Sequence, residues 1–313
     1  MKLAAPRVRV ARAGAIPRSW IVAYSLLFPA LLLLVVFTFY PVIYGSYLGF
    51  THYTAIDFAH GRSPRWNDLH NFSRVFSDSL FQTGLINSLK YLAVVPALQV
   101  ASLAVAVLVN RKLPGMTFFR ASFYVPVITS ISLAAVMWSW IYQRSGSLNW
   151  ALRLLHLLAG GQGFNWLTNT GTALWAIMLV TFWRGFGYYM VLYLAGLQSI
   201  PKEIDEAAQL DGASSWQIFW RVTVPLMKPT TLLCTLLSTL AAIRVLEEIL
   251  VLTGGGPLHS TYTALMYVYH KAFQGFSFNF GEASAAGLIV AVVGVILSVL
   301  NFRLMRESSG VKG

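Results

Sequence analysis

Six stretches of the chain stay apolar for about twenty residues or more, and polar segments separate them. A helix needs about 20 apolar residues to cross the roughly 30 Å hydrocarbon layer of a bilayer. Helices are the expected form, because backbone groups in lipid must be satisfied within their own segment. The pattern therefore predicts an all-α integral membrane protein with six transmembrane helices. These cover residues 20–50, 91–110, 121–143, 172–195, 230–253 and 283–302.

Composition supports this fold class. Apolar residues make up 57% of the 313 residues and charged residues only 11%, whereas a soluble domain carries roughly 25% charged residues. So few charges cannot cover a compact soluble protein, which excludes a typical cytoplasmic enzyme; the high apolar content excludes a disordered chain. The single cysteine, Cys234, excludes an internal disulfide framework and a cysteine-rich metal site.

The distribution of Lys and Arg predicts the orientation. Fourteen of the 23 lie on the side that holds both termini and the segments 110–120 and 196–229, against seven on the other side. Cytoplasmic loops carry the excess of basic residues, so both termini should face the cytoplasm of a multi-pass protein in the cell (inner) membrane. The first apolar stretch is too long for a signal peptide, so we expect it to remain as an anchor.

Three parts follow from this layout. They are a basic cytoplasmic tail (1–19), a six-helix transmembrane domain (20–303) that includes the loop 196–229, and a cytoplasmic C-terminal tail (304–313). The outer segments 51–80 and 143–172 are rich in Gly, Asn, Trp and Ser and should form ordered caps or short helices.

The cytoplasmic loop 196–229 predicts two short helices with a glycine corner. A proline and early acidic residues favour the start of the first helix: Pro201, Glu203, Asp205 and Glu206. Gly212 can adopt the left-handed conformation that ends it. Ser214 with Gln217 forms a capping box for a second helix over 214–220, which Pro225 and Pro229 should stop.

The charge of this loop indicates a soluble partner. It carries four of the chain's eleven acidic residues on a face that is otherwise basic. An amphipathic hairpin lying on the membrane is the alternative, but anionic headgroups would repel these carboxylates. Docking onto another protein is therefore the better interpretation.

The loop resembles the EAA loop of ABC importer permeases, which has the order Glu-Ala-Ala, three residues, Gly, nine residues, Ile, one residue, Leu-Pro. The matching positions are Glu206, Ala207, Ala208, Gly212, Val222, Val224 and Pro225. Valine replaces isoleucine and leucine, which keeps apolar bulk. Further segments look like those of carbohydrate-uptake permeases of the maltose and glycerol-phosphate type: 39–41, 183–184, 194–198, 252–257 and 263–269.

The resemblance implies a type I ABC importer permease fold in which this loop is the coupling-helix pair. It also implies the partners: a second homologous permease, two ATP-binding subunits, and an extracytoplasmic solute-binding protein. By the same resemblance the 203–220 helices contact the ATPase. The residues assigned to that contact are Glu203, Glu206, Ala207, Ala208, Asp211, Gly212, Trp216, Phe219 and Pro225.

Catalytic chemistry is not predicted for this chain. None of the seven lysines follows a glycine, so a phosphate-binding G-x-x-x-x-G-K-[S/T] loop cannot occur. The six histidines show no metal-ligand spacing, and Ser199 with Lys202 matches S-x-x-K without its companion motifs. We expect neither a bound cofactor nor a metal, and expect ATP and Mg²⁺ to be used by the partner ATPase.

The charged residues within the spans allow two interpretations. Arg244 precedes Glu247 and Glu248 by three and four residues, so in a continuous helix it shares a face with either acid. In one interpretation the cluster is a self-neutralising pair. In the other it lines a solute path, because a charge at mid-membrane costs roughly 2.5–3.5 kcal/mol and such residues tend to face water-filled cavities. Arg184 has the same two readings, with a structural role favoured.

Aromatic residues on the fourth span also have two readings. Sugars need flat apolar faces and polar partners for their hydroxyls, and Tyr189 and Tyr193 share a helical face with Tyr188 beside them. Bundle packing is the plainer interpretation. The candidate solute-path residues are Trp183, Tyr188, Tyr189, Tyr193, Arg244, Glu247 and Glu248.

These observations favour a permease subunit of an ATP-driven, binding-protein-dependent sugar importer. An ion-gradient-driven secondary transporter is the alternative, although the sequence lacks the internal repeat such proteins often show. A membrane-embedded enzyme is disfavoured by the absence of clustered catalytic residues. The cargo stays open between disaccharide, oligosaccharide, polyol and glycerol-phosphate.

Overall fold

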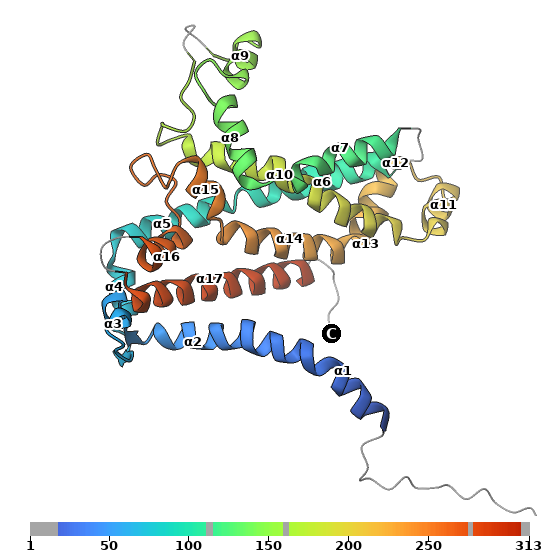
Figure 1. The fold of residues 1–313 in the computed structure, drawn as a ribbon. Helices are drawn as coiled ribbons and strands as arrows, with labels where there is room; N and C mark the ends of the chain where they lie inside the picture. The colour runs from blue at the N-terminus through green and yellow to red at the C-terminus, as the bar shows by residue number, and fades with distance from the viewer. Residues whose placement is uncertain (1–17, 111–114, 159–162, 275–277, 308–313) are drawn as a thin grey trace, which may run out of the picture. The chain divides into compact units, whose positions relative to one another are not determined.

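The computed structural model describes residues 18–110, 115–158, 163–274 and 278–307 (Figure 1). Of the predicted tails 1–19 and 304–313, residues 1–17 and 308–313 lie outside the described residues, while 18–19 belong to the first helix and 304–307 to the last; the division into tails and domain stays a prediction. The chain divides into two compact units, 1–47 and 48–313, which are described separately.

The first unit is one helical run. It comprises α1 (Arg18–Leu34), a π-helical turn η1 (Val35–Phe39) and α2 (Tyr40–Leu48). The segment Val22–Leu48 has 27 residues and a mean hydropathy of 2.5 in its most apolar window, and none of that window is buried. A helix that is apolar all round belongs in lipid or against another protein, as the predicted first span requires.

The second unit is helical apart from a two-stranded antiparallel sheet formed by β1 (Thr51–His52) and β2 (Arg65–Trp66). Its first helices are α3 (Ala55–Ala59), α4 (His70–Ser77), α5 (Ser79–Tyr91), α6 (Val94–Val109), α7 (Met116–Ile128), α8 (Ile131–Ile141) and α9 (Ser147–Leu154). The next are α10 (Ala173–Gln198), α11 (Lys202–Leu210), α12 (Ser215–Ile218), the π-helical η2 (Phe219–Thr223) and α13 (Val224–Leu226). The last are α14 (Lys228–Ile243), α15 (Glu247–Leu252), α16 (Ala264–Phe273) and α17 (Phe280–Glu307).

Within the described ranges, four helical runs are long and apolar enough to cross a membrane, and up to six if each bent pair counts as one span. The four are 22–48, 79–109, 173–198 and 280–304. The bent pairs are α7 with α8, at 99°, and the 215–226 run with α14, at 64°. The fold is thus largely helical and rich in apolar spans, and the number six stays a prediction.

The second predicted span begins too late. The helical run starts at Ser79 rather than at residue 91. The hydropathy pattern missed this earlier start because polar residues in α5 interrupt it, although these residues lie inside the fold. Asn87 donates to the carbonyl oxygens of His259 and Tyr262, and the Ser88 hydroxyl accepts from the Ala264 backbone N–H. Buried polar side chains of this kind are satisfied by long-range partners that the local sequence does not reveal.

The main core lies where α6, α10 and α14 meet, and Figure 1 shows these helices side by side. Tyr91, Ile177, Met190 and Tyr193 are among its largest fully buried side chains. Close packing of α10 on α7 depends on Gly187, where a β-carbon would collide with the Phe123 carbonyl oxygen. A second cluster joins α4, α5, α16 and α17.

The predicted cap at 51–80 is ordered around one buried acid. Thr54 and Asp57 form a capping box at the start of α3, and Asp57 lies 3.4 Å from Arg65 and 3.7 Å from Arg62. The hydrogen bond from the Thr54 hydroxyl, followed by the Thr54 backbone N–H and the charge of Arg65, holds the pKa of Asp57 below its ordinary value, although burial opposes this shift.

Candidate functional site

The predicted fifth span is broken. Helix α14 ends at Ile243 and α15 begins at Glu247. Arg244 lies at the C-terminal end of α14, where its Nε donates to the Leu240 carbonyl oxygen at 3.1 Å, and the two acids open α15. Each side-chain charge is therefore opposite in sign to the partial charge of the helix end beside it, which is a favourable arrangement. The carbonyl of Val245, freed by the break, accepts from the buried Thr263 hydroxyl at 3.1 Å.

The break corrects the pairing predicted for Arg244. Residues three and four apart share a face only in a continuous helix, and the helix is interrupted at this point. Among the described residues, Glu248 instead pairs with Arg184 of α10, with Arg184 Nη1 and Glu248 Oε1 3.1 Å apart. Arg184 thus reaches another span, and Arg244 is exposed on α14.

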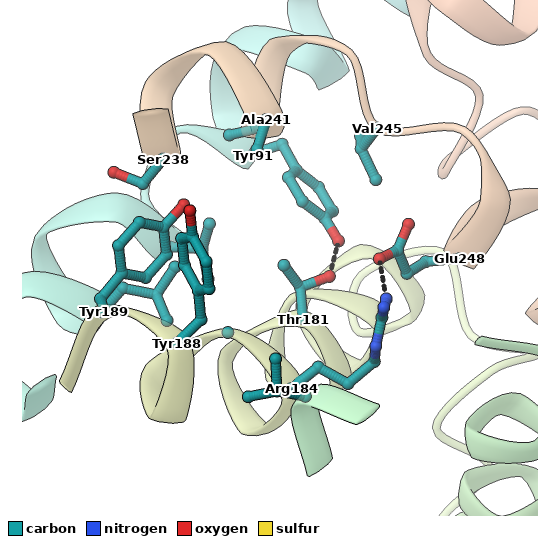
Figure 2. Close-up of a pocket in the computed structure, with 14 residues that line it drawn as sticks. Tyr91, Thr181, Arg184, Tyr188, Tyr189, Ser238, Ala241, Val245 and Glu248 are labelled. Atoms are coloured by element: carbon teal, nitrogen blue, oxygen red, sulfur yellow. Dashed lines mark hydrogen bonds and ion pairs between the residues drawn. The ribbon is translucent and has the colours of Figure 1, made fainter. Parts of the chain in front are cut away.

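A cavity of about 230 Å³ lies between α5, α6, α7, α10 and the broken span (Figure 2). Its lining residues are Tyr91, Val94, Leu98, Val127, Thr181, Arg184, Gly185, Tyr188, Tyr189, Ser238, Ala241, Ala242, Val245 and Glu248. The unwound residue Val245 forms part of the wall. Irregular backbone at membrane depth is expected where it lines a cavity or is buried in protein.

One end of the cavity holds the charged pair. Arg184 and Glu248 face each other there, and the Tyr91 hydroxyl bonds to that of Thr181 beside them (Figure 2). Within the described structure, Arg184 Nε is buried and has no hydrogen-bond partner. This end therefore combines a compensated charge with an unused donor.

The other end holds aromatic rings. Tyr188 and Tyr189 meet edge to face, with centroids 5.2 Å apart and planes at 82°. Their hydroxyls point the same way, toward the side where Ser238 lies on α14 (Figure 2). The cavity thus offers ring faces and neutral hydroxyls, the groups that bind and orient polar ligands with apolar faces.

The structure brings only some predicted solute-path residues together. Tyr188, Tyr189 and Glu248 line the cavity. Trp183 packs against Trp138 of α8, with their ring centroids 5.8 Å apart. The hydroxyl of the buried Tyr193 donates to Gln99 Oε1 at 2.8 Å. Glu247 and Arg244 are exposed and lie outside the cavity lining. Sequence reasoning missed Tyr91, Thr181 and Ser238 as cavity residues, since neutral residues in apolar runs gave no signal.

The loop between α10 and α14 has the two predicted helices, α11 and α12. Gly212 joins them with φ at 79°, and the Ser214–Gln217 capping box opens α12. The predicted stop near residue 220 is wrong, because helical structure continues past Pro225 to Leu226. The π-helical turn over 219–223 precedes this proline, and its longer hydrogen-bond spacing suits a residue without an N–H.

This loop presents acids and apolar side chains to the surroundings. Glu203, Glu206 and Asp211 are exposed, as are Leu210 at 90% and Trp216 at 70%. Of the other residues assigned to coupling, Ala207, Gly212 and Pro225 are exposed, and Ala208 and Phe219 are half-buried. Exposed large apolar side chains beside polar ones are typical of protein interaction surfaces.

No group of three or more His, Cys, Asp or Glu side chains suited to a metal ion occurs in the part of the chain that the structure describes. Cys234 is a free, buried thiol.

Comparison with known proteins gives consistent matches. The family model for the binding-protein-dependent transport system inner membrane component matches residues 91–307. The probable starch degradation products transport system permease protein AmyD of Thermoanaerobacterium thermosulfurigenes is 31% identical over 271 residues, covering 86% of this chain and 89% of that protein. The lactose transport system permease protein LacF of Rhizobium radiobacter is 30% identical over 283 residues, covering 89% of this chain and 92% of that protein.

A solved structure has the same fold. It is that of a bacterial ABC transporter involved in the import of the acidic polysaccharide alginate, with a TM-score of 0.77, 22% sequence identity, and coverage of 93% of this chain and 96% of that chain. At this identity the likeness establishes the fold alone.

Proposed function

The chain belongs to the family of binding-protein-dependent transport system inner membrane components, and we propose that it is a permease subunit of an ATP-driven sugar importer in the cytoplasmic membrane. The observation that carries the proposal is the α11–α12 loop, which presents acidic and apolar side chains from a glycine corner within the segment that the family model matches. Such a surface suits a separate soluble subunit. Family membership disfavours the ion-gradient-driven alternative.

The proposed partners complete the importer. A second permease forms the solute path with this chain, two ATPase subunits hydrolyse ATP, and an extracytoplasmic binding protein delivers the solute. Closure of the ATPases moves the 203–220 helices, and the bundle shifts from an inward-facing to an outward-facing state. This is a population shift driven by a partner with different affinities for two states. Both termini and the α11–α12 loop then face the cytoplasm.

Sugar cargo is supported by two observations. The similar permeases are named for starch degradation products and for lactose, and the cavity combines the rings of Tyr188 and Tyr189 with several hydroxyls. A sugar ring presents an apolar face and a hydroxyl edge, which matches this lining. We therefore assign the cavity to the solute path.

Co-purification tests the loop. Glu206→Lys reverses the charge of an exposed residue on α11, so the variant should insert normally but retain roughly tenfold less ATPase subunit, since like charges across an interface oppose binding. Asp68→Lys makes the same change at an exposed residue outside the loop and should retain the ATPase as wild type does. Equal retention by both variants would refute the assignment of the loop.

A further inference from the structure

Counted over the described residues, the lining of the cavity has no net charge, because its two charged residues form an ion pair. Arg184 and Glu248 are the charged members of this lining in the part of the chain that the structure describes, and Arg184 Nη1 lies 3.1 Å from Glu248 Oε1. Their side chains are 28% and 14% exposed, so both are largely removed from solvent. A charge in such a place needs a partner, and here each residue is the partner of the other.

Besides the ion pair itself, the cavity leaves hydrogen-bonding groups for a solute. Arg184 Nε is a buried donor without a partner among the described residues, and a buried donor left unsatisfied is unfavourable. A hydroxyl or carbonyl oxygen of a solute would satisfy it. The remaining polar lining consists of the hydroxyls of Tyr91, Thr181, Tyr188, Tyr189 and Ser238.

We propose that Glu248 is a specificity-determining residue: by occupying Arg184, it makes the cavity selective for neutral polyhydroxylated rings over the corresponding carboxylates. This inference rests on the proposed solute path. A carboxylate solute must lie beside the Glu248 carboxylate or displace it from Arg184, and either route meets like-charge repulsion or an uncompensated buried charge. A neutral ring meets neither obstacle.

The size of the cavity fits a single ring. Its volume of about 230 Å³ is below the roughly 300–1,000 Å³ of pockets that hold drug-sized ligands. Charge at one ring substituent is therefore felt throughout the site. Two probes isolate this charge: D-glucuronamide and D-glucuronate differ only in carrying an amide or a carboxylate.

The test measures equilibrium binding of both radiolabelled probes to the complete permease–ATPase complex in nanodiscs, without binding protein. Wild type should bind the amide about tenfold tighter than the acid or better. Glu248→Gln keeps the shape and frees Arg184, so the preference should reverse toward the acid. The double variant Arg184→Gln with Glu248→Gln should lose this gained affinity. Glu247→Gln, at the exposed neighbour, should behave as wild type.

Equal binding of acid and amide to wild type would overturn the inference, as would an unchanged ratio in Glu248→Gln. If neither probe binds any variant while the ATPase subunit co-purifies, the inference fails and the importer assignment stands. Loss of the ATPase subunit from wild type refutes the importer assignment instead. Size-exclusion profiles and ATPase retention show that each variant is folded, and Glu248→Ala replaces Glu248→Gln if the latter fails either check.

Discussion

Two regions of this protein carry acidic side chains in opposite environments. At the cavity, Glu248 is largely buried and is held by Arg184 from a helix 64 residues away in sequence. In the α11–α12 loop, Glu203, Glu206 and Asp211 are exposed and form no ion pair within the described structure. The first acid is needed by the fold, because its burial requires compensation. The loop acids contribute little to the fold, so they are free to serve a partner.

This contrast predicts a large difference in stability on removal of a charge. Arg184→Ala leaves Glu248 without its cation, and breaking a buried pair typically costs about 3–5 kcal/mol; because both side chains are partly exposed, we expect about 3 kcal/mol. The thermal midpoint of the purified protein should fall by several degrees. Glu206→Ala, at the exposed loop acid, should leave the midpoint unchanged.

A compensating variant sharpens this prediction. Arg184→Met combined with Glu248→Gln removes both charges and should recover most of the lost stability, since an ion pair replaced by neutral residues is often nearly neutral in energy. If the double variant is as unstable as Arg184→Ala, packing of the Arg184 chain rather than its charge holds the two helices together.

The two regions also differ in how far the sequence predicts them. The glycine corner, the Ser214–Gln217 capping box and the acidic first turn of α11 depend on neighbours within four residues, so the local pattern identified them. The end of α12 was mispredicted because a π-helical turn precedes Pro225.

Cavity residues were less predictable for a physical reason. The break after Ile243 contains no proline or glycine, and the carbonyl freed at Val245 is satisfied by Thr263, 18 residues away. Periodicity therefore indicated one continuous helix and paired Arg244 with the wrong residues. Tyr91 and Ser238 come from other spans and join Tyr189 only through the packing of α5, α10 and α14.

A smaller effect is expected at the glycine corner of the loop. Gly212 has φ at 79° and open space around it, so alanine there meets no clash but costs about 1–2 kcal/mol of backbone strain. Hydrogen exchange over residues 202–220 should increase, while the cavity ion pair and the global midpoint stay nearly unchanged.

Gly287 provides the matched control for this change. It also has open space around it but lies within α17 without a positive φ, so Gly287→Ala should be neutral or slightly stabilising, because alanine is the better helix former. If Gly212→Ala were equally neutral, the left-handed corner would not be required for the loop.

Asp57 combines the two kinds of acid and gives the smallest expected effect. It is buried like Glu248, but its first partner is the local Thr54 hydroxyl, as in a loop capping box. Since its pKa is lowered in the folded protein, the ionised carboxylate stabilises the 51–66 segment above the ordinary value of 3.8. That contribution declines as pH falls below 3.8 toward the lowered pKa.

Hydrogen exchange of wild type and Asp57→Asn, compared at each pH, measures this contribution, because intrinsic exchange rates cancel in the ratio. Between pH 5 and 7, residues 51–66 should exchange faster in the variant, since asparagine cannot carry the charge that Arg62 and Arg65 face. The difference should shrink as the wild-type carboxylate is protonated. Asp68→Asn, at an exposed acid in the same region whose Oδ1 accepts from Trp66 Nε1 at 2.6 Å, keeps an acceptor for that bond and should show a smaller pH dependence. A ratio constant from pH 7 down to pH 3 in Asp57→Asn would mean that the hydrogen bonds of the side chain, and not its charge, hold this segment in place.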